Sequence, residues 1–283
     1  MKFTTLVRRT LGLGATLSLM AACSPTTKQN EVKLNTDSTS IIGGEIVEKS
    51  DVISKSTVAI IASVVTADNE EGQFICTGSM LKSNIVLTAA HCVPEVGDMF
   101  KQVELFVIFN MDLHQMKPTD VRKVIDYAIH DDYGTANEFG EDDHDMALIK
   151  IAGTMPAGYQ LAKFLNDESV LKPGAKVTLA GYGLIETDGV NTKSDEKLRK
   201  VDVEIVEDFG KYEILLDQTQ GKGACHGDSG GPAFIELNGT QYVWGVTSRG
   251  AGKNGVDDCS LVSVYTKIKA ESEFVSKALN KLK

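Results

Sequence analysis

The sequence lacks an excess of positive charge and any apolar run long enough to span a bilayer in the mature chain. Its 29 Lys and Arg residues are outnumbered by 39 Asp and Glu residues, which gives a formal net charge of -10. Because phosphate binding requires a basic surface, this balance argues against nucleic acid as a partner. Internal repeats at a solenoid period are also absent, which excludes the repeat architectures. The composition is that of an ordinary globular protein, and 283 residues can build one large core or two small ones.

The longest apolar segment, residues 11–22, follows a positively charged start that contains Arg8 and Arg9. This arrangement is typical of an export signal and is too short for a membrane-spanning helix. The segment ends in MAAC at residues 20–23 and resembles a bacterial lipobox, in which Cys23 would carry lipid. We therefore expect a signal peptide over 1–23 and an exported, membrane-anchored lipoprotein that can be secreted after release. The alternative is an ordinary signal peptide cleaved near Ala22.

Cysteine is scarce, with five residues in the chain. If Cys23 carries lipid, four cysteines remain, and in an exported protein an even set indicates disulfides. Counting alone leaves three possible pairings of the four. A metal site or other cofactor is not expected, because the histidines lack ligand spacing and the cysteines are better used in bridges.

The sequence pattern changes at Ile41, from a polar segment to alternating β-rich runs and turns. Residues 24–40 are polar and should form a flexible tether or propeptide. After them, short β-rich runs alternate with Gly, Asn and Asp clusters, which predicts an all-β sandwich or barrel. Apolar residues at helical spacing predict a terminal helix over 271–282. The expected strands cover 56–65, 84–89, 102–110, 121–130, 146–151, 176–180, 198–206, 232–237, 242–248 and 261–267.

The strongest local signal is the segment GDSGGP at residues 227–232. A serine hydroxyl attacks a carbonyl only when a base takes its proton and donors stabilise the oxyanion. Glycines on both sides allow a tight turn, so the amides of Gly227 and Ser229 can point into one cavity. We predict Ser229 as the nucleophile and these two amides as the oxyanion hole, rather than a polar surface turn.

His91 and Asp145 are the candidate base and its partner. His91 lies in the segment TAAHC, residues 88–92, where small residues precede it and a cysteine follows. Asp145 lies at the start of an apolar strand, a position from which its side chain can turn inward. A carboxylate there would fix the tautomer of the histidine and support its charged form. Asp143 competes for this role.

These motifs resemble the trypsin and chymotrypsin family of serine proteases, in the family order of His91, Asp145 and Ser229. The resemblance covers essentially all of residues 41–283. It implies two six-stranded antiparallel β-barrels, with a boundary near 155–165, a C-terminal helix and the active site between the barrels. It also implies a monomeric serine endopeptidase without a cofactor, which cleaves protein or peptide substrates through an acyl-enzyme intermediate.

The resemblance also implies how the cysteines pair. Cys76 with Cys92 matches the family bridge that clamps the histidine loop, and Cys225 with Cys259 matches the bridge beside the serine. Ser248 matches the family serine that hydrogen-bonds the triad aspartate.

Activation by cleavage is a further expectation from the resemblance. The segment IIGG at residues 41–44 is similar to the family's activated N-terminus, whose α-ammonium pairs with the aspartate before the catalytic serine. Ile41 and Asp228 would form this zymogen switch here, because a buried charge is favoured only when it is paired. Ser40 precedes the cleavage site, so the activating protease is not expected to be specific for Lys or Arg.

The matched pocket positions predict a neutral cleavage preference. Gly223 corresponds to the pocket floor, and Ser248, Gly250 and Ser263 are the other predicted substrate-binding residues. A pocket for Lys or Arg needs a carboxylate to pair with the buried cation. As an alternative, Arg249 together with a histidine at 226 would favour acidic residues near the cut.

Two other functions are compatible with parts of the sequence. A binding lipoprotein with a catalytically silent protease fold is the main alternative. A serine esterase of another fold fits the string Gly-x-Ser-x-Gly at residues 227–231, but the β-rich segment after Pro232 stands where its helix should begin.

Overall fold

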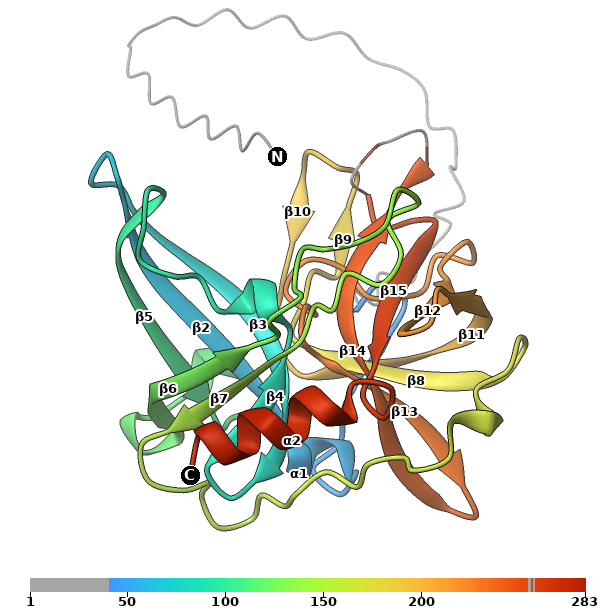
Figure 1. Ribbon diagram of the computed structural model, residues 1–283, viewed down its shortest axis with the longest axis horizontal. Coiled ribbons are helices and arrows are strands. Elements are labelled where there is room, and N and C mark those ends of the chain that lie inside the picture. The colour runs from blue at the N-terminus through green and yellow to red at the C-terminus, as the bar shows by residue number, and fades with distance from the viewer. Residues whose placement is uncertain (1–40, 254–255, 257) are drawn as a thin grey trace, which may run out of the picture. The chain divides into compact units, whose positions relative to one another are not determined.

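The computed structural model describes residues 41–253, 256 and 258–283 (Figure 1). The predicted signal peptide, the tether over 24–40 and the lipidation site Cys23 lie outside the described residues. Within the described part of the chain, no helix has the length and apolar character needed to cross a membrane.

The first half of the described chain forms a closed six-stranded antiparallel barrel. Its strands run in the order β2-β3-β4-β7-β6-β5 around the barrel, and β5 pairs with β2 to close it. Their bounds are β2 (Thr57–Thr66), β3 (Glu71–Lys82), β4 (Ile85–Thr88), β5 (Phe100–Ile108), β6 (Val121–Ile129) and β7 (Ala147–Ile151). β4 is buried along its whole length, and β7 is buried except at Lys150, which explains their continuous apolar runs.

The second half forms another antiparallel barrel, closed by the pairing of β11 with β8. Its strands are β8 (Lys176–Gly181), β11 (Arg199–Phe209), β12 (Glu213–Asp217), β13 (Pro232–Leu237), β14 (Thr240–Ala251) and β15 (Val262–Lys267). β1 (Glu45–Ile46) adds to β11, and β9 (Glu186–Thr187) pairs with β10 (Thr192–Lys193) as a separate hairpin. In β11, buried Val201 and Val203 alternate with exposed Asp202 and Glu204, as expected for a barrel strand. The two six-stranded barrels confirm the predicted fold class.

Short helices connect the strands, and one longer helix ends the chain. The short elements are α1 (Ile53–Ser56) and the 3-10 turns at Ala90–Cys92, Leu113–Gln115, Pro118–Asp120 and Glu168–Val170. The last helix, α2 (Ser272–Lys281), lies inside the predicted range 271–282. It follows β15 of the second barrel but packs its buried Phe274 and Ala278 into the core of the first, against β6 and β7 (Figure 1).

The segment between β7 and β8 is attached to both barrels. The backbone N–H of Ala162 donates to Met80 O in β3 of the first barrel (2.9 Å). A few residues later, Leu165 N–H donates to Val243 O (2.9 Å), and Val243 N–H donates to Lys163 O (2.7 Å) in the second barrel. The linker is therefore hydrogen-bonded to both sides of the interface.

Candidate active site

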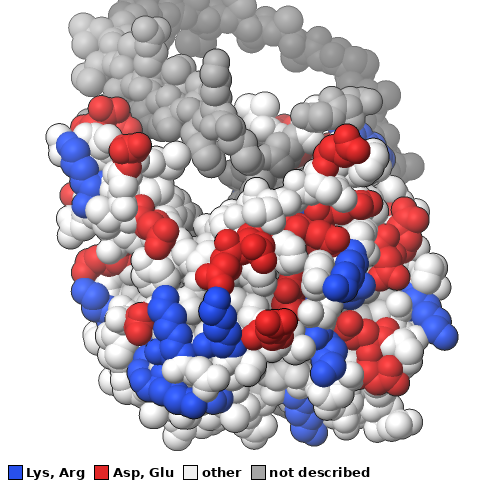
Figure 2. Space-filling model, viewed as in Figure 1, with Lys and Arg blue, Asp and Glu red and all other residues white. Residues whose placement is uncertain are grey.

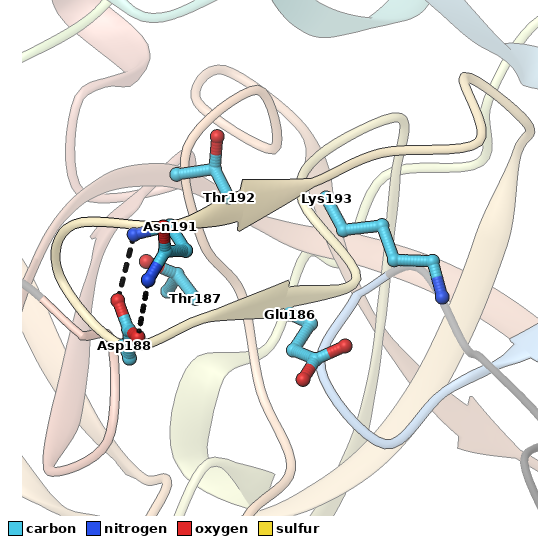
Figure 3. Close-up of a pocket in the computed structure, with 6 residues that line it drawn as sticks. All are labelled: Glu186, Thr187, Asp188, Asn191, Thr192 and Lys193. Atoms are coloured by element: carbon cyan, nitrogen blue, oxygen red, sulfur yellow. Dashed lines mark hydrogen bonds between the residues drawn. The ribbon is translucent and has the colours of Figure 1, made fainter. Parts of the chain in front are cut away.

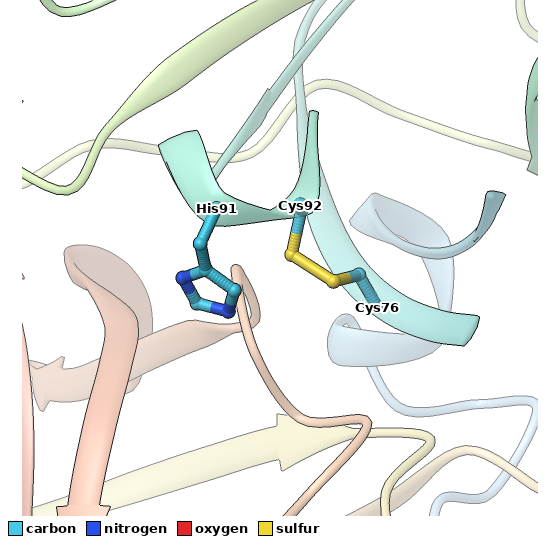
Figure 4. A group of neighbouring side chains, drawn as sticks. All are labelled: Cys76, His91 and Cys92. Carbon is cyan, nitrogen blue, oxygen red and sulfur yellow. A yellow bond between two sulfur atoms is a disulfide. The ribbon is translucent and has the colours of Figure 1, made fainter. Parts of the chain in front are cut away.

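His91 lies in the 3-10 turn Ala90–Cys92 that follows β4. A disulfide between Cys92 and Cys76 ties this turn to β3, with 6.1 Å between the two Cα atoms. Figure 4 shows the imidazole and the disulfide projecting from neighbouring residues of the same turn. Because both sulfurs are used in the bridge, this His–Cys–Cys group offers no thiolate to a metal.

Asp145 holds His91 through two hydrogen bonds, one to the imidazole and one to the backbone. Its Oδ2 atom lies 2.7 Å from His91 Nδ1, and its Oδ1 atom accepts the backbone N–H of His91 at 3.0 Å. Ser248 Oγ donates to the same Oδ2 atom at 2.7 Å. Asp145 is 2% exposed. Between the two candidates, Asp145 is thus the carboxylate that contacts the ring, while Asp143 acts on it only through its charge.

The ion pair sets the proton affinity of both partners. Burial lowers the pKa of His91, but the charge and hydrogen bond of Asp145 outweigh it, and the pKa stands above its usual value. Burial raises the pKa of Asp145, but His91 and the Ser248 hydroxyl outweigh it, and the pKa stands below its usual value. The pair therefore favours an imidazolium beside an ionised carboxylate, as a general base needs once it has taken a proton.

The Ser229 loop is fixed against the strand that leads to His91. Thr77 in β3 donates its N–H to Ser229 O (2.8 Å) and its hydroxyl to Gly227 O (2.9 Å). A Cβ atom on Gly230 would overlap Thr88 Oγ1, so only glycine fits there. Among the described residues, Ser229 Oγ has no hydrogen bond, so the predicted nucleophile is not bonded to His91, the predicted base. Such loose contacts are common when substrate is absent.

Two backbone amides beside Ser229 remain available to an oxyanion. Gly227 has a left-handed φ of 98°, and a Cβ atom there would lie 2.8 Å from Gly183 Cα. This conformation requires glycine. Among the described residues, no protein acceptor engages the N–H of Gly227 or of Ser229. Both amides can therefore donate to a substrate oxygen.

Asp228 is buried directly beneath this turn. It is 1% exposed, and it accepts the N–H of Gly183 (2.8 Å) and of Cys225 (2.9 Å). Burial raises the pKa of Asp228 to about 7, and the two N–H groups lower it only partly. Ile41, its predicted switch partner, is 0% exposed in the core of the second barrel.

Two of the predicted pocket residues, Gly250 and Ser263, are neighbours in the second barrel. Gly250 on β14 pairs with Ser263 on β15. Gly223 donates its N–H to Ile42 O at 2.9 Å, which links the pocket floor to the segment beginning at Ile41. Ser263 is 1% exposed and its hydroxyl has no hydrogen-bond partner among the described residues.

Gln218, which packs against Gly223 at the predicted pocket floor, was missed by the sequence analysis. Its side-chain amide donates to Ala224 O (3.1 Å) and Cys259 O (2.6 Å), and its Oε1 accepts the N–H of Ala224 (2.7 Å). A Cβ atom on Gly223 would overlap this side chain. The second disulfide, Cys225–Cys259, borders the same region. Both bridges implied by the family resemblance are thus present.

An ion pair beside Ser248, in which Glu213 is buried and Arg249 is partly exposed, also had no signal in the sequence. Arg249 makes a two-pronged salt bridge to Glu213, with both N–O distances at 2.7 Å. Its charge is thus paired with Glu213, and the alternative that Arg249 favours acidic residues near the cut stays a prediction.

A third group joins residues that are far apart in the sequence. Glu271, just before α2, accepts hydrogen bonds from His144 Nδ1 (2.6 Å) and His130 Nε2 (3.2 Å). The three ligand atoms lie within 4.8 Å of one another, a grouping the sequence spacing did not reveal. However, His130 Nδ1 accepts the N–H of Asp132, so its proton sits on Nε2 and opposes metal binding there.

The surface hollow at the β9–β10 hairpin is separate from the triad. It is lined by Glu186, Thr187, Asp188, Asn191, Thr192 and Lys193, and Figure 3 shows Asp188 and Asn191 bonded across the turn. These bonds close the hairpin turn. On the molecular face in Figure 2, acidic and basic side chains occur side by side.

The sequence is similar to proteins of the trypsin family. A family model described as Trypsin matches residues 49–275. The chain is 27% identical to the venom peptide isomerase heavy chain of Agelenopsis aperta, covering 74% of this chain and 90% of that protein. It is 29% identical to brachyurin of Leptuca pugilator (64% and 78% covered) and 28% identical to chymotrypsin of Phaedon cochleariae (68% and 70% covered).

Proposed function

This chain belongs to the trypsin family, and we propose from that premise that it is a serine endopeptidase. One observation carries the proposal: the hydrogen-bonded series Ser248–Asp145–His91 lies beside a Ser229 loop locked to the same barrel by Thr77. A protein that only binds has no need of a buried carboxylate that stabilises an imidazolium.

In the proposed mechanism, Ser229 Oγ attacks the scissile carbonyl while His91 Nε2 takes its proton. Asp145 keeps the Nδ1–H of His91 oriented and stabilises the imidazolium that forms. The tetrahedral oxyanion receives hydrogen bonds from the amides of Gly227 and Ser229. The imidazolium then protonates the leaving amine, and the acyl-enzyme forms as the C–N bond breaks. Water activated by His91 hydrolyses the acyl-enzyme and regenerates Ser229.

Activation by cleavage before Ile41 is part of the proposal. Cleavage would free an α-ammonium at Ile41, and Asp228 is a buried carboxylate that lacks a cationic partner among the described residues. An ammonium there would lower the pKa of Asp228 and stabilise the turn that carries the oxyanion amides. Because Ser40 stands before the cut, we propose an activating protease that does not require Lys or Arg.

We propose a preference for neutral side chains at the cut. Gly223, Gly250 and Ser263 contribute no charge to the pocket, and a buried Lys or Arg would stay unpaired there. A peptide library should therefore show preferred cleavage after uncharged residues, and strong selection for Lys or Arg would refute this.

We further propose that the protein is exported and lipidated on Cys23, with the lipid as its only attachment to a membrane. Cleavage before Ile41 would then release a monomeric catalytic domain. Immunoblots of membrane and soluble fractions test this, because an active form that stays in the membrane fraction contradicts release.

The deciding experiment labels the exported protein with a fluorophosphonate and locates the label by mass spectrometry, with Ser229→Ala as the control. Products of a peptide substrate are analysed in parallel, because one relative is named a peptide isomerase and cleavage has to be seen directly. Labelled Ser229, two product peptides and a new N-terminus at Ile41 would support the whole proposal. Labelling and cleavage without that N-terminus would remove the activation step. Failure to label even a form beginning at Ile41 would favour the binding lipoprotein.

A further inference from the structure

We propose that Arg249 is a positioning residue for the catalytic series, a role that rests on the proposed peptidase function. Arg249 directly follows Ser248 in β14, and its guanidinium contacts Glu213, Gly140 O and the Ser248 hydroxyl. Through these contacts it orients the hydroxyl that bonds Asp145 and holds the loop that leads to Asp145.

Glu213 fixes the guanidinium in place. This first residue of β12 is 0% exposed, and each of its carboxylate oxygens accepts an Arg249 N–H at 2.7 Å. Its Oε2 atom also accepts the backbone N–H of Asp142 at 2.8 Å. A buried carboxylate is costly unless it is paired, and the planar guanidinium matches both of its oxygens. The Arg249 side chain is 32% exposed, but its guanidinium is held in place by the buried carboxylate.

The held guanidinium determines which way the Ser248 hydroxyl points. Arg249 Nη1 lies 3.1 Å from Ser248 Oγ, which lies 2.7 Å from Asp145 Oδ2. A guanidinium can only donate, and a serine hydroxyl has a single hydrogen. The hydroxyl must accept from Arg249 and give its hydrogen to Asp145. Without Arg249 the hydroxyl can rotate away from the carboxylate that orients His91.

The same pair anchors the loop before Asp145. Arg249 Nη2 donates to Gly140 O, and Glu213 accepts the N–H of Asp142. The Asp142 carboxylate in turn accepts two backbone N–H groups from the turn that precedes β12, Lys211 at 3.0 Å and Tyr212 at 2.7 Å. The loop is thus tied to the second barrel directly before Asp145.

The test uses a double variant, because removing one partner leaves a buried charge unpaired. Glu213→Gln/Arg249→Gln removes both charges and keeps polar side chains of similar size. Arg122→Gln is the matched control, because the hydrogen bonds of Arg122 go to backbone oxygens of Thr119, Val121 and Thr154 and its guanidinium lies over the Phe109 ring, away from the catalytic series. Each variant is made in the full chain and compared after activation.

We expect kcat of the double variant to fall about tenfold with little change in KM, because one charge-assisted hydrogen bond is lost from the series. The acid limb of kcat/KM should move to higher pH, because the Asp145 charge would then act more fully on His91. Adding Ser248→Ala should cost little more, because both changes remove the same interaction. The proposal would be overturned if the double variant kept the wild-type kcat and pH profile, or if only its KM changed. Losses in kcat that add when Ser248→Ala is combined with the double variant would also overturn it.

Arg249→Lys covers the case in which the double variant does not fold. Lysine keeps the charge near Glu213 but cannot bind both carboxylate oxygens and the Ser248 hydroxyl together. The low-field proton resonance of His91 Nδ1–H should shift in this variant and stay unchanged in Arg122→Gln. An unchanged resonance and kcat would overturn the positioning role. If the wild-type protein neither labels nor cleaves, the failure lies in the proposed function instead.

Discussion

Gly230 and Thr88 are packed so closely that the residue after the nucleophile has no room for a side chain. Thr88 Oγ1 donates to Thr77 O (2.9 Å), and a Cβ atom on Gly230 would overlap Thr88 Oγ1 and lie 2.5 Å from Thr77 O. The two residues belong to different barrels. The contact therefore sets how far the serine loop lies from the strand that leads to the histidine.

Gly230→Ala should abolish fluorophosphonate labelling, because the added methyl group pushes the Ser229 loop away from β3 and β4. Gly239→Ala is the matched control. Gly239 has a φ of 73°, close to the 78° of Gly230, but has open space around its Cβ direction. Both variants pay for left-handed alanine, about 1 kcal/mol, and only Gly230→Ala adds a clash. Equal labelling of the two variants would contradict the packing argument.

Asp228→Asn should change stability and activity in opposite ways. In the uncleaved chain the pKa of Asp228 is raised to about 7 by burial, while an unfolded aspartate titrates near 3.8. Between these values the folded state binds the extra proton, so wild-type stability falls as pH rises from about 4 to 7. Asparagine removes this loss, which amounts to about 4 kcal/mol at most. Urea unfolding of both proteins at pH 4 and pH 8 measures this stability difference. Parallel pH dependences of the wild type and Asp228→Asn would refute the prediction.

In the form cleaved before Ile41, the same substitution should inactivate the enzyme. The freed ammonium would lose its carboxylate partner, and the oxyanion turn would lose its support. An active, cleaved Asp228→Asn protein would disprove the proposed switch while leaving the triad untouched.

Asp145→Asn should lower kcat roughly 10⁴-fold, because the amide favours the wrong tautomer of His91. The pKa of His91 is raised by Asp145, so wild-type kcat/KM should fall as pH drops through a value above 6.5. In the variant this acid limb should move to lower pH, because the negative charge that holds the proton is gone. Initial rates across pH 5 to about 9 measure both effects. An acid limb that does not move would mean that another group controls it.

Removing either disulfide should cost about 3 to 4 kcal/mol of stability, judged from the 16- and 34-residue separations that the bridges close. Their effects on catalysis should differ. Replacing Cys76 and Cys92 by alanine should slow labelling, because the His91 turn loses its anchor. Replacing Cys225 and Cys259 should alter peptide preference, because Cys259 O binds the Gln218 side chain under the pocket floor. Identical peptide preferences in the two variants would contradict this assignment.

Much of the fold was predictable because burial patterns are local. The alternation in β11 and the apolar runs of β4 and β7 indicated strands directly. β3 and β12 were missed for different reasons. β3 contains two glycines and several polar residues, and β12 begins with Glu213, whose burial depends on Arg249 thirty-six residues later. An ion pair between residues this far apart produces no periodic hydrophobic pattern from which a strand could be predicted.

The candidate triad could be predicted because each member lies in a distinctive local segment. Gln218 and Glu213 could not, because their roles arise only when β12 is placed beside β15 and the Asp145 loop. The identity of Arg249 suggested a substrate contact from sequence, and only the structure revealed its internal partner. Long-range electrostatics, rather than secondary structure, limited the prediction.

The linker between the barrels has a mechanical consequence. Hydrogen bonds from Ala162 to Met80 and from Leu165 to Val243 fasten its middle to both barrels, and α2, which follows the second barrel, packs on the first. A two-lobed molecule of this kind would otherwise be free to open like a hinge. Here, opening would break backbone hydrogen bonds to both barrels and separate α2 from β6 and β7. The predicted base and nucleophile, contributed by opposite barrels, are therefore held at a fixed separation, and in the proposed enzyme a substrate would have to adapt to that spacing rather than set it by closing the barrels.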